Sequence, residues 1–181
     1  MPEPRILPSA DLDGGVDIGD GSSIWHLAQV RGGAEIGENV IVGRGAYIGS
    51  GVHVGDNCKI QNYALVYEPA SLADGVFVGP AAVFTNDHAP RAINADGSLK
   101  SASDWDRVGV TVERGAAIGA RAVCVAPVRI GEWASVGAGA VGAGAAVWFA
   151  ASAAADAVSA GAAEGGPAFG LSCSTTAARP R

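Results

Sequence analysis

Large apolar residues recur at every sixth position along the first half of the chain. A small or β-branched residue stands two places before each of them, and glycine often follows. The apolar positions are Ile18, Ile24, Val30, Ile36, Val42, Ile48, Val54, Ile60, Val66, Leu72, Val78 and Phe84. An α-helix repeats about every 3.6 residues and a long strand alternates, so neither gives this period. Short strands separated by a turn every six residues do.

Three such strands close a triangular coil of eighteen residues. Side chains two places apart point to the same face of a strand, so the small and the large residue of each repeat both enter the interior. Successive coils stack about 4.8 Å apart, and residues eighteen apart therefore lie above one another. Glycine at the corners fits places where a positive φ or a crowded backbone penalises a Cβ atom. The pattern predicts an all-β fold, a single-stranded parallel β-helix with three aliphatic ladders inside.

The repeat is interrupted once. It resumes at Val112 and continues to Val136, but Val112 is not a multiple of six residues after Phe84, so a loop of about 85–108 must leave the coil. A long insertion in a rigid array is more often a binding or catalytic element than a packing device. Cys124 takes an inward place in the resumed repeat, where we expect a small buried apolar residue.

These boundaries divide the chain into three parts. We expect a lead-in over residues 1–15, the β-helix domain over 16–141 and an atypical tail rich in Ala and Gly over 142–181. Gly142 occupies the next inward place, and beyond it the six-residue order is lost.

Composition agrees with a narrow interior and excludes several classes. Of 181 residues, 27 are Gly and only 6% are aromatic, whereas 49% are hydrophobic. A net charge of -6 argues against a nucleic-acid partner. The N-terminus lacks an apolar run typical of a signal peptide, and the long uncharged stretch near the tail is mostly Ala and Gly, so we expect no membrane insertion. Three cysteines without a CxxC pair indicate neither a disulfide framework nor a zinc site, and we expect a cytoplasmic protein.

Several sequence runs resemble the hexapeptide-repeat acyltransferases, and within them the nucleotide-amino-sugar N-acetyltransferases. The runs are Ser23-Ile24-Trp25-His26, Lys59-Ile60-Gln61-Asn62, Val78-Gly79-Pro80, Phe84-Thr85-Asn86-Asp87 with Pro90-Arg91, Glu113-Arg114-Gly115-Ala116-Ala117-Ile118-Gly119-Ala120, Ile130-Gly131-Glu132 and Val136-Gly137-Ala138-Gly139-Ala140-Val141. The resemblance implies a left-handed β-helix that works as a homotrimer. It also implies transfer of an acetyl group from acetyl-CoA to the 3-amino group of a UDP- or dTDP-linked sugar made for surface polysaccharides.

This transfer needs a neutral amine beside the thioester carbonyl, a path for the amine proton and donors for the developing oxyanion. The thiolate leaving group can take the proton, so a strong protein base is not obligatory. The resemblance implies that Asn86 and Asp87 orient the sugar amine. His88 is a candidate general base, because histidine changes charge near neutral pH. The alternative for His88 is an exposed loop histidine without a catalytic role.

Further substrate contacts are expected from Glu68, Arg91 and Gln61. Glu68 stands eighteen residues before Asn86, hence one coil away and roughly 5 Å distant in backbone, where it either holds the substrate amine or is a solvated corner carboxylate. Arg91 suits a sugar carboxylate or a diphosphate, because its planar fork matches either group. Gln61 lies on another edge of the coil, which a trimer would bring to a neighbour's loop.

For acetyl-CoA, the resemblance implies a pantetheine groove lined near Gly119, Ala120, Gly137 and Ala138. No metal is expected. Two alternatives stay open: a hexapeptide O- or N-acetyltransferase for another small acceptor, and a non-catalytic or carbonic-anhydrase-like β-helix. The metal enzyme needs three histidines together, and the three in this chain, His26, His53 and His88, have different offsets in the coil. We expect His53 to face outward.

The residues after Val141 depart from the resemblance. Related sequences usually end with an Asp-Val-Pro segment and a Gly-x-Pro-Ala-Arg close, which are missing here. Our hypothesis is an altered reading frame. Sequencing the coding DNA tests it, because an alternative frame should encode the Val-Pro and Pro-Ala-Arg ending.

Overall fold

The computed structural model describes residues 2–143, and every regular element among them is a short β-strand. Sheet A contains β1 (Arg5–Ile6), β4 (Ser23–Ile24), β7 (Ile41–Val42), β10 (Lys59–Ile60), β13 (Phe77–Val78), β16 (Ala117–Ile118) and β19 (Ser135–Val136). Sheet B contains β2 (Asp11–Leu12), β5 (Gln29–Val30), β8 (Tyr47–Ile48), β11 (Leu65–Val66), β14 (Val83–Phe84), β17 (Val123–Val125) and β20 (Val141–Ala143). Sheet C contains β3 (Asp17–Ile18), β6 (Glu35–Ile36), β9 (His53–Val54), β12 (Ser71–Leu72), β15 (Val110–Val112) and β18 (Val128–Ile130). The predicted tail from residue 144 onward, and the reading-frame hypothesis with it, lie outside the described residues.

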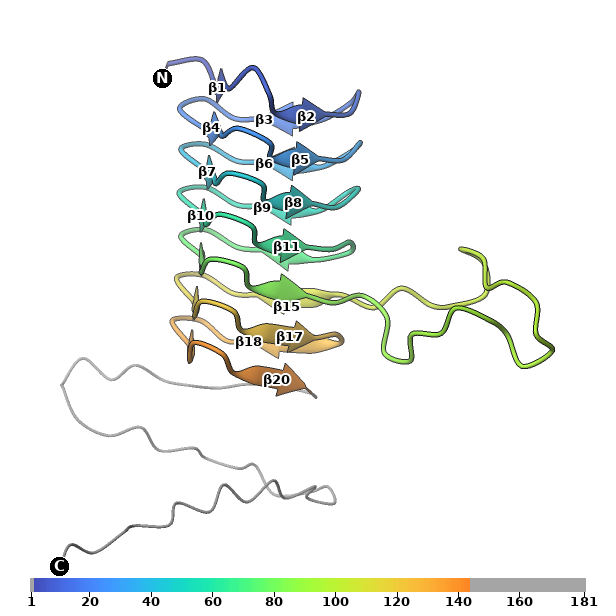
Figure 1. Ribbon diagram of the computed structural model, residues 1–181. Coiled ribbons are helices and arrows are strands. Elements are labelled where there is room, and N and C mark those ends of the chain that lie inside the picture. The colour runs from blue at the N-terminus through green and yellow to red at the C-terminus, as the bar shows by residue number, and fades with distance from the viewer. Residues whose placement is uncertain (1, 144–181) are drawn as a thin grey trace, which may run out of the picture.

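The three sheets form the sides of a triangular column in which the chain winds as a left-handed coil (Figure 1). All strand pairs are parallel, and before the insertion each residue pairs with the one eighteen places on, as Leu65 does with Val83. After the insertion the same stacking resumes, with Phe84 opposite Cys124. The predicted coil of three strands is thus confirmed.

The interior is made of the predicted ladders. The inward residues from Ile24 to Ile130 are almost completely buried, and Phe84 is the largest fully buried side chain. Cys124 is also fully buried, as predicted, and Gly142 pairs with it at the inward place of β20. A narrow prism accepts aliphatic and small residues, which accounts for the few aromatic side chains inside it.

The β-helix begins earlier than the predicted start at residue 16. β1 pairs with β4 and β2 pairs with β5, so the coil already starts at Arg5. Ile6 and Leu12 extend the six-residue series backwards from Ile18. Ile6 remains 47% exposed because it lies in the first coil, which has no preceding coil to cover it.

The sequence suggested two reasons for glycine at the corners, a positive φ and a crowded backbone. Crowding is the reason at the glycine that directly follows the aliphatic position. A Cβ atom on Gly55 would stand 2.8 Å from the backbone nitrogen of Asp74 in the next coil, and Gly55 has no positive φ. Positive φ angles occur two residues later in the turn, for example at Asn57 with φ 59°.

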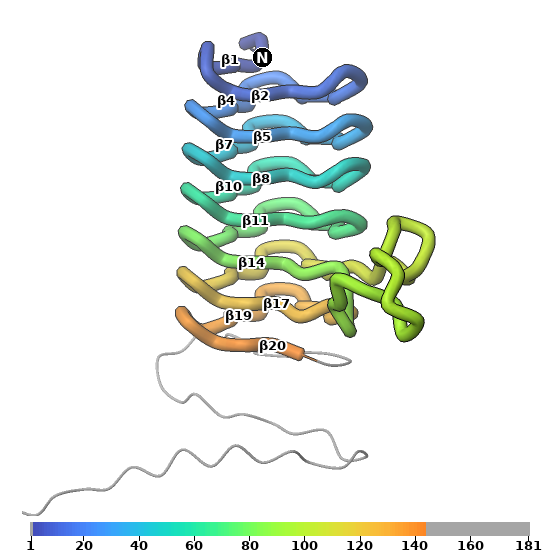
Figure 2. The backbone as a smooth tube through the Cα atoms, turned by 45° about the vertical axis from the view of Figure 1, so that its right-hand side comes forward, coloured from blue at the N-terminus to red at the C-terminus, as the bar shows by residue number. Residues whose placement is uncertain are grey.

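The predicted insertion is confirmed as an arm, residues 85–109, that projects from one edge of the column (Figure 2). Its own contacts order it: Ile93 bridges Leu99 in antiparallel fashion, and the Asp104 carboxylate accepts from the N–H and hydroxyl of Ser101. These bonds lower the pKa of Asp104. In residues 2–143 there is no helix with the length and apolarity needed to cross a membrane.

Candidate active site

The turns between the sheets form three edges of the column. Corner A joins sheet A to sheet B, corner B joins sheet B to sheet C, and corner C joins sheet C to sheet A. The predicted site residues fall on two of these edges. Corner B carries Glu68 and the arm, whereas corner A carries Gln61 and the residues predicted to line the CoA groove.

Asn86 lies at the base of the arm, where the coil and the arm are tied together. Thr85 donates its N–H to the carbonyl oxygen of Cys124 at 3.0 Å, and its Oγ1 accepts from the N–H of Ala126 at 3.0 Å. The carbonyl oxygen of Asn86 accepts from the N–H of Val108 at 3.1 Å, which closes the arm. The half-buried side-chain amide of Asn86 makes no hydrogen bond within residues 2–143. The backbone there is fixed and the amide is unused.

Asp87 is held by the arm itself. Its Oδ1 accepts from the N–H of Ala89 at 2.8 Å, and its Oδ2 lies 3.8 Å from Nζ of Lys100. Both side chains are largely buried, with 23% of Asp87 and 16% of Lys100 exposed. The sequence did not indicate Lys100, because the arm has no repeat that relates positions 87 and 100. The contacts assign Asp87 a role in ordering the arm.

His88 is exposed and lines a hollow of about 600 Å³. The walls come from the following coil and include Thr111 on β15, Pro127 at corner B and Arg129 on β18. Arg129 forms an ion pair with Glu113. His88 therefore has space beside it for another molecule, as a base acting on a substrate would need.

Glu68 lies one coil before Asn86, as predicted, because β11 and β14 pair with Val66 opposite Phe84. Its Oε2 is buried and has no hydrogen-bond partner in residues 2–143. Comparable corner side chains are satisfied by the coil before them: Oδ1 of Asn62 accepts from the N–H of Arg44 at 2.9 Å. The Glu68 Oε2 atom is directed at Gly49 in the preceding coil and is closed to a ligand, so only the other carboxylate oxygen is left for a substrate.

Two tyrosines lie beside Glu68. The rings of Tyr47 and Tyr67 have centroids 5.0 Å apart and are tilted by 44°. Burial raises the pKa of the Tyr47 hydroxyl, and the nearby Glu68 carboxylate raises it further.

Arg91 is exposed on the arm and is not brought to the other site residues. Its Nη1 donates to the carbonyl oxygen of Pro90 at 2.8 Å, and it forms no ion pair with a carboxylate of the described chain. Its predicted contact with a substrate anion stays a prediction.

At corner A, the four small residues predicted to line the CoA groove stack in pairs. Gly119 and Ala120 lie one coil before Gly137 and Ala138, because Ile118 pairs with Val136. A Cβ atom on Gly119 would stand 2.7 Å from the Cα of Ala138, so stacking alone requires this glycine. A Cβ atom on Gly137 would meet nothing within 4 Å. Gly137 belongs to the last described coil, so the residues that would follow it along the column lie outside the described range.

Sheet B separates the two corners. Gln61 precedes β11 and Glu68 follows it, and an extended segment of this length spans roughly 15–20 Å. Figure 1 shows the arm leaving only one end of sheet B. A single chain therefore does not bring Gln61 and the small residues of corner A to Asn86 and Asp87.

Two segments of the chain match models of known repeats. Residues 15–50 match the bacterial transferase hexapeptide, a model of six repeats, and residues 109–141 match the hexapeptide repeat of succinyl-transferase. No curated protein matches the whole chain significantly.

Among solved structures, a variant of perosamine N-acetyltransferase from Caulobacter crescentus, in complex with CoA and GDP-perosamine, is 20% identical over 77% of this chain and 52% of its own, with a TM-score of 0.42. A variant of the N-acyltransferase AntD from Bacillus cereus, in complex with dTDP and coenzyme A, is 18% identical over 78% of this chain and 70% of its own, with a TM-score of 0.43. The chain spans about half the length of the perosamine enzyme. The two matched segments are similar to hexapeptide repeats, and the stacked coils have the architecture of a left-handed β-helix.

Proposed function

We propose that this chain is an acetyl-CoA-dependent N-acetyltransferase whose acceptor is the 3-amino group of a nucleotide-linked amino sugar. The product would serve surface polysaccharide synthesis in the cytoplasm. The observation that carries the proposal is the base of the arm, where the half-buried amide of Asn86 makes no hydrogen bond within residues 2–143 and lies one coil from Glu68. Both groups can bind an amine. Of the two similar structures, one holds GDP-perosamine, a nucleotide-linked amino sugar, and the other holds the nucleotide dTDP, each together with CoA.

In this proposal the described side chains divide the work. The Asn86 amide oxygen and the Glu68 carboxylate accept hydrogen bonds from the sugar amine and direct its lone pair to the thioester. Asp87, bonded to Ala89 and facing Lys100, keeps the arm in place. His88 takes the proton of the attacking amine, or the departing thiolate takes it. Acetyl-CoA supplies the thioester, and its pantetheine chain lies along the small residues Gly119, Ala120, Gly137 and Ala138.

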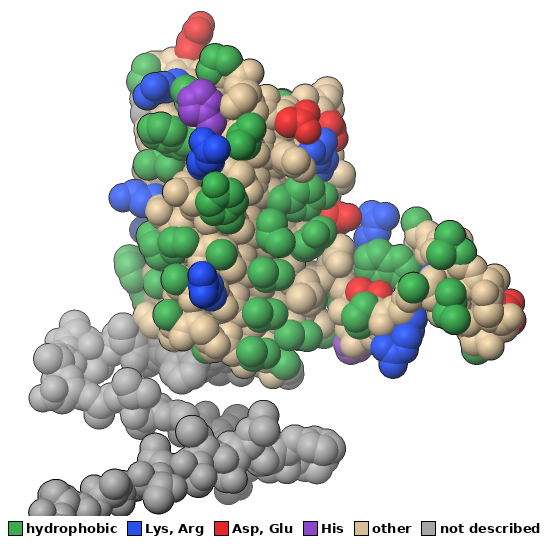
Figure 3. Space-filling view, in the orientation of Figure 1, with side chains coloured by type: hydrophobic (Ala, Val, Ile, Leu, Met, Phe, Trp, Pro, Cys, Tyr) green, Lys and Arg blue, Asp and Glu red, His purple; other side chains and the backbone are tan. Residues whose placement is uncertain are grey.

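The proposed enzyme is a homotrimer, and the outward face of sheet B supports this. From the third coil onward its outward positions are apolar (Tyr47, Leu65, Val83, Val123 and Val141), whereas the first two coils carry Asp11 and Gln29 there. Figure 3 shows hydrophobic side chains over this face, and Val141 is 70% exposed. An apolar stripe of this kind is typical of an interface.

Turning sheet B of each copy toward a three-fold axis has a geometric consequence. Sheet B runs from corner A to corner B, so corner B of one copy meets corner A of the next. Asn86 and Asp87 would then face the neighbour's Gln61, Gly119 and Gly137. The interface would complete the site that one chain leaves divided.

The alternatives differ in what the structure offers them. An enzyme for a different small acceptor would use the same residues at corner B, and the acetylation assay described below distinguishes the two kinds of acceptor. The carbonic-anhydrase-like alternative gains no support, because residues 2–143 contain no cluster of three or more His, Cys, Asp or Glu side chains arranged for a metal. His26 lies at corner A, His53 on sheet C and His88 on the arm.

The test is acetyl transfer from acetyl-CoA to a panel of UDP- and dTDP-linked 3-amino sugars, followed by free CoA release and product mass. Asn86→Ala should lower turnover about 100-fold, because a positioned polar group at a reacting centre contributes on that scale. His53→Ala is the matched control, since His53 is exposed on sheet C and contacts Glu35 at 3.3 Å. The proposed acceptor would be refuted if none of the amino sugars in the panel is acetylated while a simple alcohol is. Equal losses from the two variants would refute the site.

A further inference from the structure

A second hollow, of about 530 Å³, lies at corner A in the first half of the column. Its lining includes Trp25, Arg44, Gln61 and Asn62. Asn62 has a structural contact, because its Oδ1 accepts from the N–H of Arg44. The side chains of Trp25, Arg44 and Gln61 have no such role in the coil.

Two arginines have no carboxylate partner in residues 2–143: Arg44, which lines this hollow, and Arg5, which lies outside the lining but beside Trp25. Nε of Arg44 donates to the Tyr63 hydroxyl at 3.3 Å, and the Arg5 guanidinium lies 5.5 Å from the centroid of the Trp25 ring. By contrast, Arg31 on corner B forms ion pairs with two aspartates. In a chain of net charge -6, the uncompensated cations at corner A make a local site for an anion.

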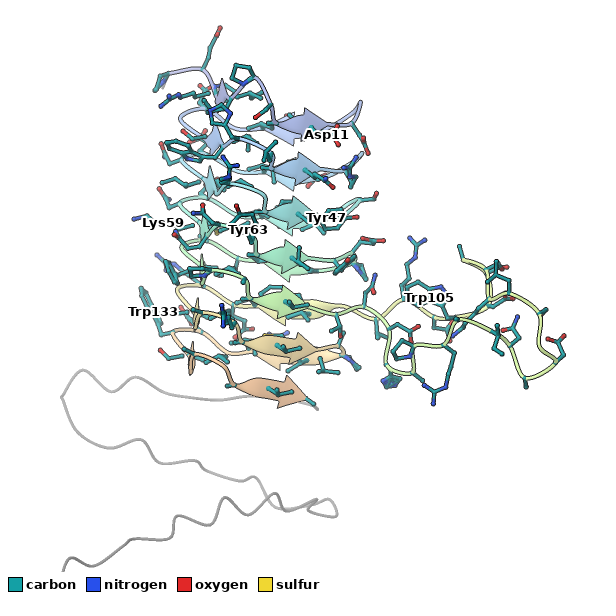
Figure 4. All side chains as sticks on the ribbon, in the orientation of Figure 1. Asp11, Tyr47, Lys59, Tyr63, Trp105 and Trp133 are labelled. Atoms are coloured by element: carbon teal, nitrogen blue, oxygen red, sulfur yellow. The ribbon has the colours of Figure 1, made fainter. Side chains whose placement is uncertain are left out.

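Two aromatic rings accompany these cations. Trp25 is 40% exposed and Tyr63 is 54% exposed. The Tyr63 ring packs on the preceding turn, since a Cβ atom on Gly45 would stand 2.6 Å from its Cε1. Figure 4 shows Tyr63 on the column, away from Trp105 in the arm. A ring fixed in this way offers a flat surface for a base at little cost in side-chain entropy.

We propose that this hollow binds the nucleoside diphosphate part of the acceptor. The base stacks on Trp25 or Tyr63, and the diphosphate is bound by Arg44 and Arg5 through charge-assisted hydrogen bonds. Gln61 contributes its amide to the same ligand. The identity of the attached sugar rests on the proposed function, whereas the binding of a nucleoside diphosphate does not.

The height of the hollow along the column agrees with this assignment. Arg44 lies two coils before Pro80, which belongs to the coil where the arm begins, so about 10 Å separates the two levels. A sugar with its first phosphate bridges such a gap and, in the proposed trimer, would place its amine near the arm of the neighbouring copy. CoA also contains a nucleoside diphosphate, but its predicted groove at Gly119 and Gly137 lies on the other side of the arm level. The hollow is therefore assigned to the sugar nucleotide.

The test measures binding without catalysis. Isothermal titration of the full chain with UDP, dTDP, GDP and CoA gives separate affinities. Arg44→Gln should weaken binding of the best nucleoside diphosphate about tenfold or more, since hydrogen bonds to charged groups contribute more than neutral ones. Trp25→Leu should weaken it about as much through lost stacking. CoA affinity should not change in either variant.

The matched control is Arg114→Gln, an exposed arginine at corner C, which should leave all four affinities unchanged. Wild-type protein that binds none of UDP, dTDP and GDP would overturn the inference. Equal losses from Arg44→Gln and Arg114→Gln, or a loss confined to CoA, would overturn it too. Acetyl transfer is assayed separately: nucleotide binding that depends on Arg44 in a protein without transferase activity would uphold this site and refute the proposed function.

Discussion

A site divided between neighbouring copies predicts that two inactive variants restore each other's activity. Asn86→Ala damages corner B and leaves corner A intact. Gly137→Leu damages corner A, because the added side chain projects into the groove that the proposal gives to pantetheine. It should still fold, since among residues 2–143 a Cβ atom at Gly137 meets nothing within 4 Å and no positive φ is required there. With acetyl-CoA held below its Michaelis constant, each variant alone should retain about 1% of wild-type activity.

The expected recovery follows from counting. Co-expression of the two variants in equal amounts gives random trimers, in which each site takes corner B from one copy and corner A from the next. A site is intact only when the first copy is Gly137→Leu and the second is Asn86→Ala, which occurs in about one quarter of sites. Activity should therefore rise to roughly a quarter of the wild-type value, about 25-fold above either parent.

The assay is CoA release by the whole population of co-expressed trimers, purified through one affinity tag that every chain carries. A control mixes wild-type chain with the double variant, where a shared site again predicts about one quarter and a site within one chain predicts about one half. Mixed trimers of the two single variants that stay near 1% would refute the shared site. That result would also contradict the proposed packing of sheet B toward the three-fold axis of the trimer.

Three further outcomes test the fold. Ile60→Ala should lower the free energy of unfolding by about 2–5 kcal/mol in urea titrations, because Ile60 is fully buried, whereas Lys59→Ala on the outward side of the same strand should change it by less than about 0.5 kcal/mol. Gly49→Ala should lower the melting temperature, because its Cβ atom would stand 2.6 Å from a backbone nitrogen of the next coil, and Gly14→Ala, with nothing within 4 Å, is its control. Burial raises the pKa of the Cys58 thiol to about 11, so the unfolded chain ionises first as pH rises. Unfolding free energy should then fall between about pH 9 and 11, and Cys58→Ala should reduce that fall; an unchanged pH profile would contradict it.

The coil was predictable from sequence because its rule is local and repeated. Every inward position needs a side chain that fits the same narrow interior. A fixed spacing of six residues therefore predicts the strands, the turns and the stacked ladders at once. The same rule set Glu68 beside Asn86 and Cys124 inside the column. Extrapolating the series backwards from Ile18 would also have found the first coil at Arg5.

The arm and the corner hollows were less predictable, because no repeat governs their contacts. Lys100 reaches Asp87 through an irregular loop, and nothing in the spacing relates the two positions. The pairing state of Arg44 depends on which carboxylates lie near it in space. Only the folded column shows that Arg31 is compensated by aspartates whereas Arg44 is not.

Together the two proposals divide the column by height. The sugar nucleotide occupies corner A before the level of the arm, and CoA occupies the same corner after it. Since coils rise about 4.8 Å each, the reacting amine and thioester meet only near the coil of Asn86. A substitution at Arg44 should therefore raise the Michaelis constant for the sugar nucleotide. A substitution at Gly137 should raise the Michaelis constant for acetyl-CoA. Only changes at the arm's base should lower the rate at saturation of both substrates, because only those residues face both ligands at once.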